Sequence, residues 1–375
     1  MKIAYTISGL YNSGGMENIL IQKANYLADI LGYNITIITT DQKSRPSFFS
    51  LSHKVNLIDL GVNYQDAKQS KLWHLKKLYL KKIHQKALTY YLKNNNYDIV
   101  ISLMDFDFSF LYKIKDGSKK ILEYHFAKYS KVNATNNIIK KIIQKCRADS
   151  WDKVVANYDK FIVLTKEDKE QWKNLDNVRV IPNFIKKLPN RKAELRNKRV
   201  ISVGRADFQK GFDMLIDAWS IVSKNFPDWI LTIIGGGDKA SLQNQINKLC
   251  LSDSIKLLPP NPDIEEEYLD SSLYVMSSRF EGLPLVLLEA MSFGLPIVSF
   301  NCPCGPKDIL KPDFSSLVDS GDIKGLAREL MRWINNYSYR KEAQYNAIRE
   351  ANKYTIEKTM KIWDTLFIEV YDGNK

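Results

Sequence analysis

The chain has 375 residues, of which 45% are hydrophobic and 26% are charged, and its formal net charge is +13. This length exceeds what one compact core accommodates, so we expect two domains of ordinary size. No stretch reaches the roughly 18 uninterrupted apolar residues of a membrane span. The opening residues also lack the long apolar region of a signal peptide, so we expect a cytoplasmic protein. The charge favours an anionic partner without choosing among nucleic acid, membrane headgroups and phosphorylated small molecules.

Strand-like and helix-like segments alternate through the first half of the chain. The predicted strands are residues 2–8, 34–40, 55–60, 97–104, 120–125 and 161–165. Helical patterns cover residues 17–31 and the stretch around 137–156. This alternation predicts a parallel, doubly wound sheet.

The same pattern restarts after a polar linker at residues 186–198. The predicted strands are residues 199–204, 229–234, 255–258, 273–277 and 296–300, and the predicted helices are 211–225, 241–251, 264–271 and 285–293. We therefore predict an α/β protein with domains at residues 1–182 and 183–354. A C-terminal helix at residues 355–375 is expected to pack back on the first domain. Two such domains place a ligand cleft at the carboxyl ends of their strands.

The four cysteines do not predict a metal or disulfide framework. They are Cys146, Cys250, Cys302 and Cys304. They have neither the paired spacing of a zinc site nor the density of a disulfide scaffold. We expect reduced thiols, while the close spacing of Cys302 and Cys304 leaves a strained disulfide or a metal fragment open.

Residues 278–291 read Ser-Arg-Phe-Glu-Gly-Leu-Pro-Leu-Val-Leu-Leu-Glu-Ala-Met and place Glu281 and Glu289 eight positions apart. Gly282 and Pro284 are expected to open a helix, and eight residues bring both carboxylates toward one side of it. Unpaired N–H groups at the start of a helix attract anions. A sugar–phosphate–ribose ligand fits this pattern, but so does an ordinary capped helix with two solvated glutamates.

Residues 203–211, Val-Gly-Arg-Ala-Asp-Phe-Gln-Lys-Gly, follow a predicted strand. Arg205 offers a fork for phosphate oxygens, and Lys210 adds a compact charge nearby. Two surface cations in a loop are the alternative. A third loop, at residues 8–17, carries Gly14 and Gly15 without the dinucleotide-binding spacing, so it fits either close approach to a ligand or a plain turn.

Together these motifs resemble glycosyltransferase family 4, whose members are retaining enzymes with the GT-B fold of two Rossmann-like domains. The resemblance runs over nearly the whole chain. It covers residues 14–17, 181–183, 204–211 and 235–237 and the E-x7-E motif at 281–289. Residues 294–306 are similar to bacterial members that build surface polysaccharides from uridine-diphosphate sugars.

The resemblance implies transfer of a hexose or N-acetylhexosamine from a UDP-sugar to a saccharide or lipid-linked saccharide acceptor. The leaving phosphate would help deprotonate the acceptor hydroxyl, so Glu281 is not expected to be a covalent nucleophile. No metal cofactor is expected. The alternatives are a GT-B sugar-nucleotide epimerase, which needs no acceptor, and a phosphorylase, which needs inorganic phosphate.

The resemblance also implies roles for individual residues. Arg205 and Lys210 would hold the donor diphosphate, Glu289 the ribose hydroxyls, and Glu281 the transferred sugar. His125, after the strand at residues 120–125, matches a family histidine near the donor sugar, although a core histidine remains an alternative.

The backbone of the E-x7-E motif and of the first glycine-bearing loop would complete the donor site. The donor-binding positions are Gly15, Gly282, Leu283, Pro284, Leu285 and Val286.

Two further patterns bear on partners. Asp105-Phe106-Asp107 has a metal-binding D-x-D form, but it lies far in sequence from the cationic motif, and we do not expect it to bind a metal. Residues 71–93 form a basic amphipathic helix, and residues 138–147 are a second basic run. Such a helix suits anionic headgroups, or it is simply the solvated face of a helix packed on a sheet.

The resemblance favours weak association with the inner face of the plasma membrane, because related polysaccharide-building enzymes act on lipid-linked acceptors. A nucleic-acid partner is not expected, since no RNP-type, helix-turn-helix or zinc-finger pattern is present.

Overall fold

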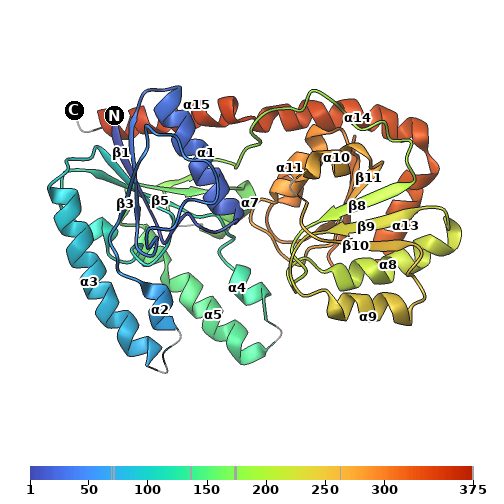
Figure 1. The fold of residues 1–375 in the computed structure, drawn as a ribbon, viewed down its shortest axis with the longest axis horizontal. Helices are drawn as coiled ribbons and strands as arrows, with labels where there is room; N and C mark the ends of the chain where they lie inside the picture. The colour runs from blue at the N-terminus through green and yellow to red at the C-terminus, as the bar shows by residue number, and fades with distance from the viewer. Residues whose placement is uncertain (69, 71, 136, 173–174, 262, 374–375) are drawn as a thin grey trace.

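The computed structural model describes residues 1–68, 70, 72–135, 137–172, 175–261 and 263–373. It contains two α/β units side by side (Figure 1), each built around one parallel sheet. The predicted fold class is therefore confirmed.

The first sheet has the strand order β3-β2-β1-β4-β5-β6-β7, and every neighbouring pair is parallel. Its strands are β1 (Lys2–Ile7), β2 (Asn34–Thr39), β3 (Asn56–Asp59), β4 (Ile99–Ser102), β5 (Lys119–Glu123), β6 (Lys160–Val163) and β7 (Val178–Val180). The helices between them are α1 (Gly15–Asp29), α2 (Tyr64–Lys68), α3 (Trp73–Lys93), α4 (Ser130–Asn133), α5 (Ile138–Ser150), α6 (Asp152–Val155) and α7 (Lys166–Gln171), with a 3₁₀ turn η1 (Leu111–Lys113). The order reverses between β1 and β4, so the loops after these strands diverge there and leave space for a ligand.

The second sheet has the order β10-β9-β8-β11-β12-β13 and reverses between β8 and β11. Its strands are β8 (Arg199–Val203), β9 (Ile230–Ile234), β10 (Ile255–Leu258), β11 (Leu273–Met276), β12 (Ile297–Asn301) and β13 (Ser315–Asp319). Its helices are α8 (Phe212–Asn225), α9 (Ala240–Lys248), α10 (Ile264–Leu269), α11 (Leu285–Ser292), α12 (Pro306–Ile309), α13 (Ile323–Asn335) and α14 (Tyr337–Ala351), followed by the 3₁₀ turn η2 (Asn352–Tyr354). Sequence analysis did not identify the edge strands β7 and β13, because short edge strands with polar residues lack the apolar run that marks a central strand.

The C-terminal helix α15 (Ile356–Asp372) packs on the first domain (Figure 1). Its buried side chains, including Met360, Trp363 and Phe367, belong to the same hydrophobic core as β1, β2 and α1. The two chain crossings between the domains lie side by side, because the amide of Ile185 donates to Tyr354 and that of Ile356 donates to Ile185.

The predicted basic helix at residues 71–93 corresponds to α3, although Lys71 lies outside the described residues. Its buried side chains, His84, Leu88 and Leu92, all lie in the C-terminal half. The other half projects from the body of the first domain (Figure 1). Within the described ranges, no helix is both long enough and apolar enough to cross a membrane.

A buried ion pair connects three elements of the first domain. Nζ of Lys23 on α1 donates to both carboxylate oxygens of Glu123 at the end of β5, at 2.6 and 2.5 Å. The same Nζ lies 4.0 Å from the ring centroid of Trp363 on α15, which is a cation–π distance. Burial alone would raise the pKa of Glu123, but Lys23 and His125 outweigh it and lower that pKa to about 2. The carboxylate therefore stays ionised beside the lysine.

We expect Lys23→Met to destabilise the protein by about 3–5 kcal/mol at neutral pH, because Glu123 would keep a buried charge without its ammonium partner. The pair contributes its stability above the ordinary glutamate pKa of 4.5 and loses it as the pH falls toward 2. The difference in the free energy of unfolding between wild type and variant should therefore become smaller at acidic pH. Urea unfolding at several pH values measures this. Adding Glu123→Gln to Lys23→Met should recover part of the lost stability, because the unpaired buried charge is removed. A Lys23→Met variant as stable as wild type at neutral pH would contradict a stabilising role for the Lys23–Glu123 pair.

Candidate active site

Glycines bring the loops after β8 and β9 into direct backbone contact. A Cβ added at Gly235 would lie 1.8 Å from the carbonyl oxygen of Gly204. At Gly211, where φ is +62°, a Cβ would lie 2.2 Å from the carbonyl oxygen of Ser277, which follows β11. No larger residue fits either position without moving the backbone, so these loops meet only because the residues are glycine.

Lys210 and Glu281 form the charged centre of the second domain's loops. Nζ of Lys210 donates to Oε1 of Glu281 at 2.8 Å. The same carboxylate accepts from Ser278 Oγ at 2.7 Å and from Gln209 Nε2 at 3.2 Å. Glu281 is only 6% exposed, so three donors satisfy a nearly buried charge. Sequence analysis identified Lys210 and Glu281 but missed Gln209 and Ser278. Gln209 lies within the motif at residues 203–211 and Ser278 within the motif at 278–291, and this was the only indication of their role in the sequence.

Arg205, which was predicted to hold the donor diphosphate together with Lys210, does not join the Lys210–Glu281 pair. Its side chain is 75% exposed, and its Nε lies 3.0 Å from Oδ2 of Asp207. The structure thus places Lys210 against Glu281 and leaves Arg205 at the surface of the loop. A third cation, Arg279, donates to both oxygens of Asp213 at 2.9 and 2.6 Å and holds the Glu281 loop on the first turn of α8.

Helix α11 begins at Leu285, and no side chain caps its first amides. Glu281 therefore lies in the loop before the helix. The predicted helix at residues 285–293 agrees with α11, but the helical spacing used to bring both carboxylates toward one side does not apply to Glu281. The actual placement follows from Pro284, whose extended ψ of 104° keeps the preceding residues out of the helix. Glu289 is on the helix, and its Oε2 accepts from Tyr268 Oη at 2.9 Å. Burial raises the pKa of Glu289.

The two domains touch at the start of this helix. A Cβ at Gly282 would lie 2.6 Å from the carbonyl oxygen of His125, so the two backbones are in direct contact. Gly15, at the start of α1, faces Leu285 with its Cβ position 3.6 Å from Cδ1. The amino ends of α1 and α11 therefore meet at the contact between the two domains.

His125 lies beside the buried ion pair. Its side chain is 5% exposed, and Nε2 lies 3.1 Å from Oε1 of Glu123 without the alignment of a hydrogen bond. The structure therefore brings the backbone of His125, Gly15 and the residues from Gly282 to Leu285 together where the two domains meet. Lys210 is linked to this region through Glu281.

Two further predictions concern the D-x-D sequence and the cysteines. Asp107 of the D-x-D sequence accepts from Thr6 Oγ1 at 2.6 Å and from Ser102 Oγ at 2.9 Å, so hydroxyls occupy both of its oxygens. In the part of the chain that the structure describes, no three His, Cys, Asp or Glu side chains are grouped as metal ligands. All four cysteines are free thiols, and Cys302 and Cys304 are buried, so the disulfide alternative was wrong.

Comparison with known proteins agrees with this arrangement. The model of the family "Glycosyltransferase Family 4" matches residues 13–187, and that of "Glycosyl transferases group 1" matches residues 184–350. An uncharacterized glycosyltransferase of Haemophilus influenzae is 32% identical over 370 residues, which are 96% of this chain and 98% of that protein. An α-1,4-N-acetyl-D-galactosaminyltransferase of Campylobacter jejuni, named for a saccharide linked to PP-undecaprenol, is 26% identical over 99% of both chains.

Solved structures share the fold. S. aureus TarM superposes with a TM-score of 0.78 at 16% identity, over 98% of this chain and 99% of that one. The lipopolysaccharide outer core galactosyltransferase WaaB superposes with a TM-score of 0.75 at 19% identity, over 98% and 99%. The fold, the interdomain cleft and a full-length relative at 32% identity together show that the chain belongs to glycosyltransferase family 4 and is a glycosyltransferase.

Proposed function

We propose that the protein transfers a hexose or N-acetylhexosamine, with retention of anomeric configuration, from a UDP-sugar to a saccharide or lipid-linked saccharide during surface-polysaccharide biosynthesis. The observation that carries this proposal is the meeting of Lys210–Glu281 and the uncapped start of α11 with Gly15 and His125 across one cleft. A nucleoside diphosphate sugar bound here would place its negatively charged diphosphate and its scissile bond beside these groups.

The donor diphosphate is assigned to Lys210 and the amides that open α11. An ammonium has three donors, and Glu281 takes one of those of Lys210, so the others are available to phosphate oxygens. Arg205 can swing from Asp207 to add a second cation, because its side chain is largely in solvent. Preorganised donors of this kind stabilise the charge that grows on a leaving diphosphate.

The nucleoside is assigned to the side of α11 that bears Glu289. A cavity of about 490 Å³ there is lined by Glu289, Tyr268 and Leu285 and by Asn18 and Gln22 of α1. Its volume is within the usual range of small-molecule sites. The Tyr268 hydroxyl donates to one oxygen of Glu289. Within the described part of the chain no hydrogen bond to the other oxygen is present, so that oxygen can accept from ribose hydroxyls.

The names of the relatives support the proposed pathway and acceptor. The Campylobacter jejuni relative acts on an undecaprenol diphosphate-linked saccharide. Another relative, the amylovoran biosynthesis glycosyltransferase AmsD of Erwinia amylovora, is 34% identical over 56% of this chain and 62% of that protein. A lipid-linked saccharide acceptor for this chain is consistent with both.

The proposal is tested by screening UDP-sugars for binding and slow hydrolysis, and then by determining the anomeric configuration of the transferred sugar by NMR. An α-linked donor should yield an α-linked product. Conversion of a UDP-sugar without any acceptor would instead indicate an epimerase, and dependence on inorganic phosphate would indicate a phosphorylase.

We expect Lys210→Ala and Arg205→Ala each to lower turnover by about a hundredfold or more, because loss of one preorganised charge donor costs about 2.7–4 kcal/mol of barrier. Steady-state rates of the purified variants measure this. Lys248→Ala removes an exposed lysine from α9 of the same domain and should leave turnover unchanged. Near-normal rates in both site variants would overturn the assignment of the diphosphate.

Since these side chains and amides supply the positive charge in the proposed reaction, turnover should persist after EDTA treatment and dialysis. The same assay, with and without added Mg²⁺ or Mn²⁺, checks this expectation. Loss of turnover on chelation and recovery with one cation would contradict it.

A further inference from the structure

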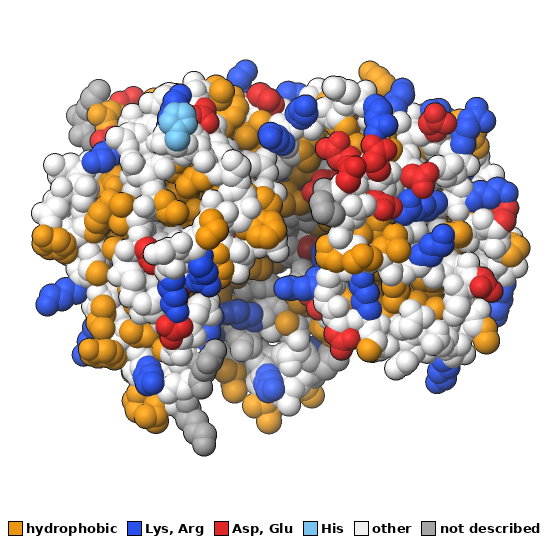
Figure 2. Space-filling model, viewed as in Figure 1, with side chains coloured by type: hydrophobic (Ala, Val, Ile, Leu, Met, Phe, Trp, Pro, Cys, Tyr) orange, Lys and Arg blue, Asp and Glu red, His pale blue; other side chains and the backbone are white. Residues whose placement is uncertain are grey.

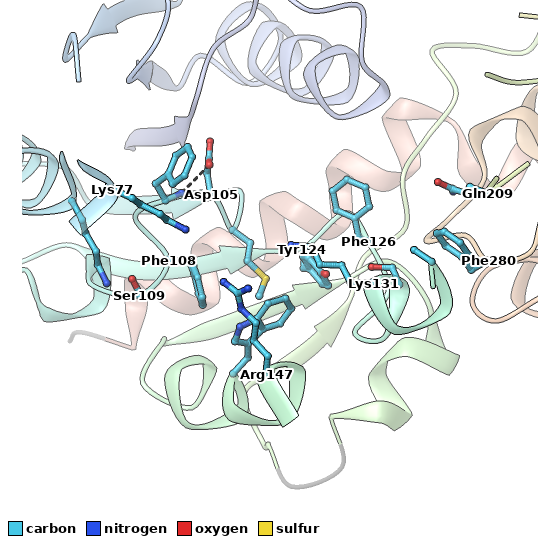
Figure 3. Close-up of a pocket in the computed structure, with 16 residues that line it drawn as sticks. Lys77, Asp105, Phe108, Ser109, Tyr124, Phe126, Lys131, Arg147, Gln209 and Phe280 are labelled. Carbon is cyan, nitrogen blue, oxygen red and sulfur yellow. Dashed lines mark hydrogen bonds between the residues drawn. The ribbon is translucent and has the colours of Figure 1, made fainter. Parts of the chain in front are cut away.

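A second cavity, of about 630 Å³, lies on the first domain's side of the cleft. α3, α4, α5 and the loops after β4 and β5 form its walls, and Gln209 and Phe280 of the second domain close one end. Figure 3 shows the lining side chains in a row from Lys77 to these two residues. Because Gln209 also donates to Glu281, this end of the cavity is adjacent to the proposed sugar-transfer centre.

Four cations from three helices line the cavity: Lys77 and Lys81 of α3, Lys131 of α4 and Arg147 of α5. Burial lowers the pKa of Lys77, and its repulsion by Arg147, Lys131 and Lys81 lowers it further. Among the described residues, no carboxylate forms an ion pair with any of the four. Converging cations without counterions indicate that the cavity is built for an anion.

The rest of the lining is largely aromatic, with one acid. Phe106, Phe108, Tyr124 and Trp151 contribute rings, and Nζ of Lys77 lies 5.6 Å from the centroid of Phe106. Burial and Asp107 raise the pKa of Asp105, the one carboxyl among the lining residues, to about 6. The four cations therefore outweigh the acid, and the cavity combines positive charge with apolar walls.

The outer ends of the same helices expose apolar side chains. On α5, Ile138, Ile139, Ile142 and Ile143 are 58–75% exposed, and on and beside α3, Leu72, Leu75, Leu78 and Tyr79 are 59–66% exposed. Figure 2 shows hydrophobic side chains at the lower end of the first domain, with lysines and arginines near them. Clustered exposed apolar residues mark an interaction surface, and interleaved cations suit anionic headgroups.

We propose that this cavity binds the diphosphate of a polyprenyl-linked acceptor. Lys77, Lys81, Lys131 and Arg147 neutralise the diphosphate, and the acceptor saccharide extends toward Gln209 and Phe280. The lipid leaves between α3 and α5 into an anionic bilayer, which their exposed apolar residues contact. This inference rests on the proposed function and specifies where its acceptor is held.

Binding of farnesyl diphosphate, a soluble diphosphate joined to an isoprenoid chain, tests the cavity without any sugar transfer. We expect the Lys77→Ala/Arg147→Ala variant to bind it at least about tenfold more weakly than wild type, because two charge-assisted contacts are lost. Lys82→Ala/Lys86→Ala removes two exposed lysines of α3 that do not line the cavity, and it should bind normally.

UDP titration of the same samples separates this inference from the proposed function and shows that each variant is folded. UDP affinity should be equal in all of them, because the variants lie outside the donor site. Wild-type affinity of the double variant for farnesyl diphosphate would overturn the inference even if UDP binds. Equal affinity for inorganic pyrophosphate would also overturn it, since the site would then hold a free diphosphate. Failure of UDP to bind the wild type would instead refute the proposed function.

Co-sedimentation with phosphatidylglycerol vesicles tests the outer surface. Ile139→Ser/Ile143→Ser should lower the bound fraction several-fold, because two exposed isoleucines are removed from the proposed contact. Ile362→Ser/Ile368→Ser is the matched control, since both residues are about half-exposed on α15. Equal sedimentation of the two variants would contradict bilayer contact by α5.

Discussion

The site depends on the contact between the backbone of Gly282 and that of His125. The absence of a side chain at Gly282 lets the loop before α11 rest on the carbonyl of His125. The amino ends of α1 and α11 also meet here, at Gly15 and Leu285. A Cβ at Gly282 would lie 2.6 Å from the carbonyl oxygen of His125 and would push the two domains apart.

Two buried carboxylates near this contact are held by lysines. Glu281 is held by Lys210, Ser278 and Gln209, and Glu123 is held by Lys23. Among the described residues, Arg205 has only the partly exposed Asp207 as an ion-pair partner, and the cations between α3 and α5 have none. We assign the donor phosphates to Lys210 and Arg205 and the acceptor phosphates to the cations between α3 and α5.

The two assignments place a diphosphate on each side of the transfer centre. The donor's would lie at α11, and the acceptor's at the far end of the cavity that begins at Gln209. Gln209 takes part in both regions, because it lines the acceptor cavity and donates to Glu281. The long helix α15 packs on the first domain beside the buried ion pair, where Trp363 lies against Lys23. The two chain crossings between the domains are hydrogen-bonded to each other.

Local patterns in the sequence determined the two parallel sheets, the linker and the positions of the motifs, because strand and helix periodicity and glycine placement are properties of neighbouring residues. They also identified Lys210, Glu281 and Glu289 by spacing. Two features emerged only from the tertiary structure: the Lys210–Glu281 pair and the contact of Gly282 with His125. Each joins residues that lie far apart in the chain. The same holds for the four cations of the second cavity, which come from three helices and gather only because packing on one sheet brings those helices together.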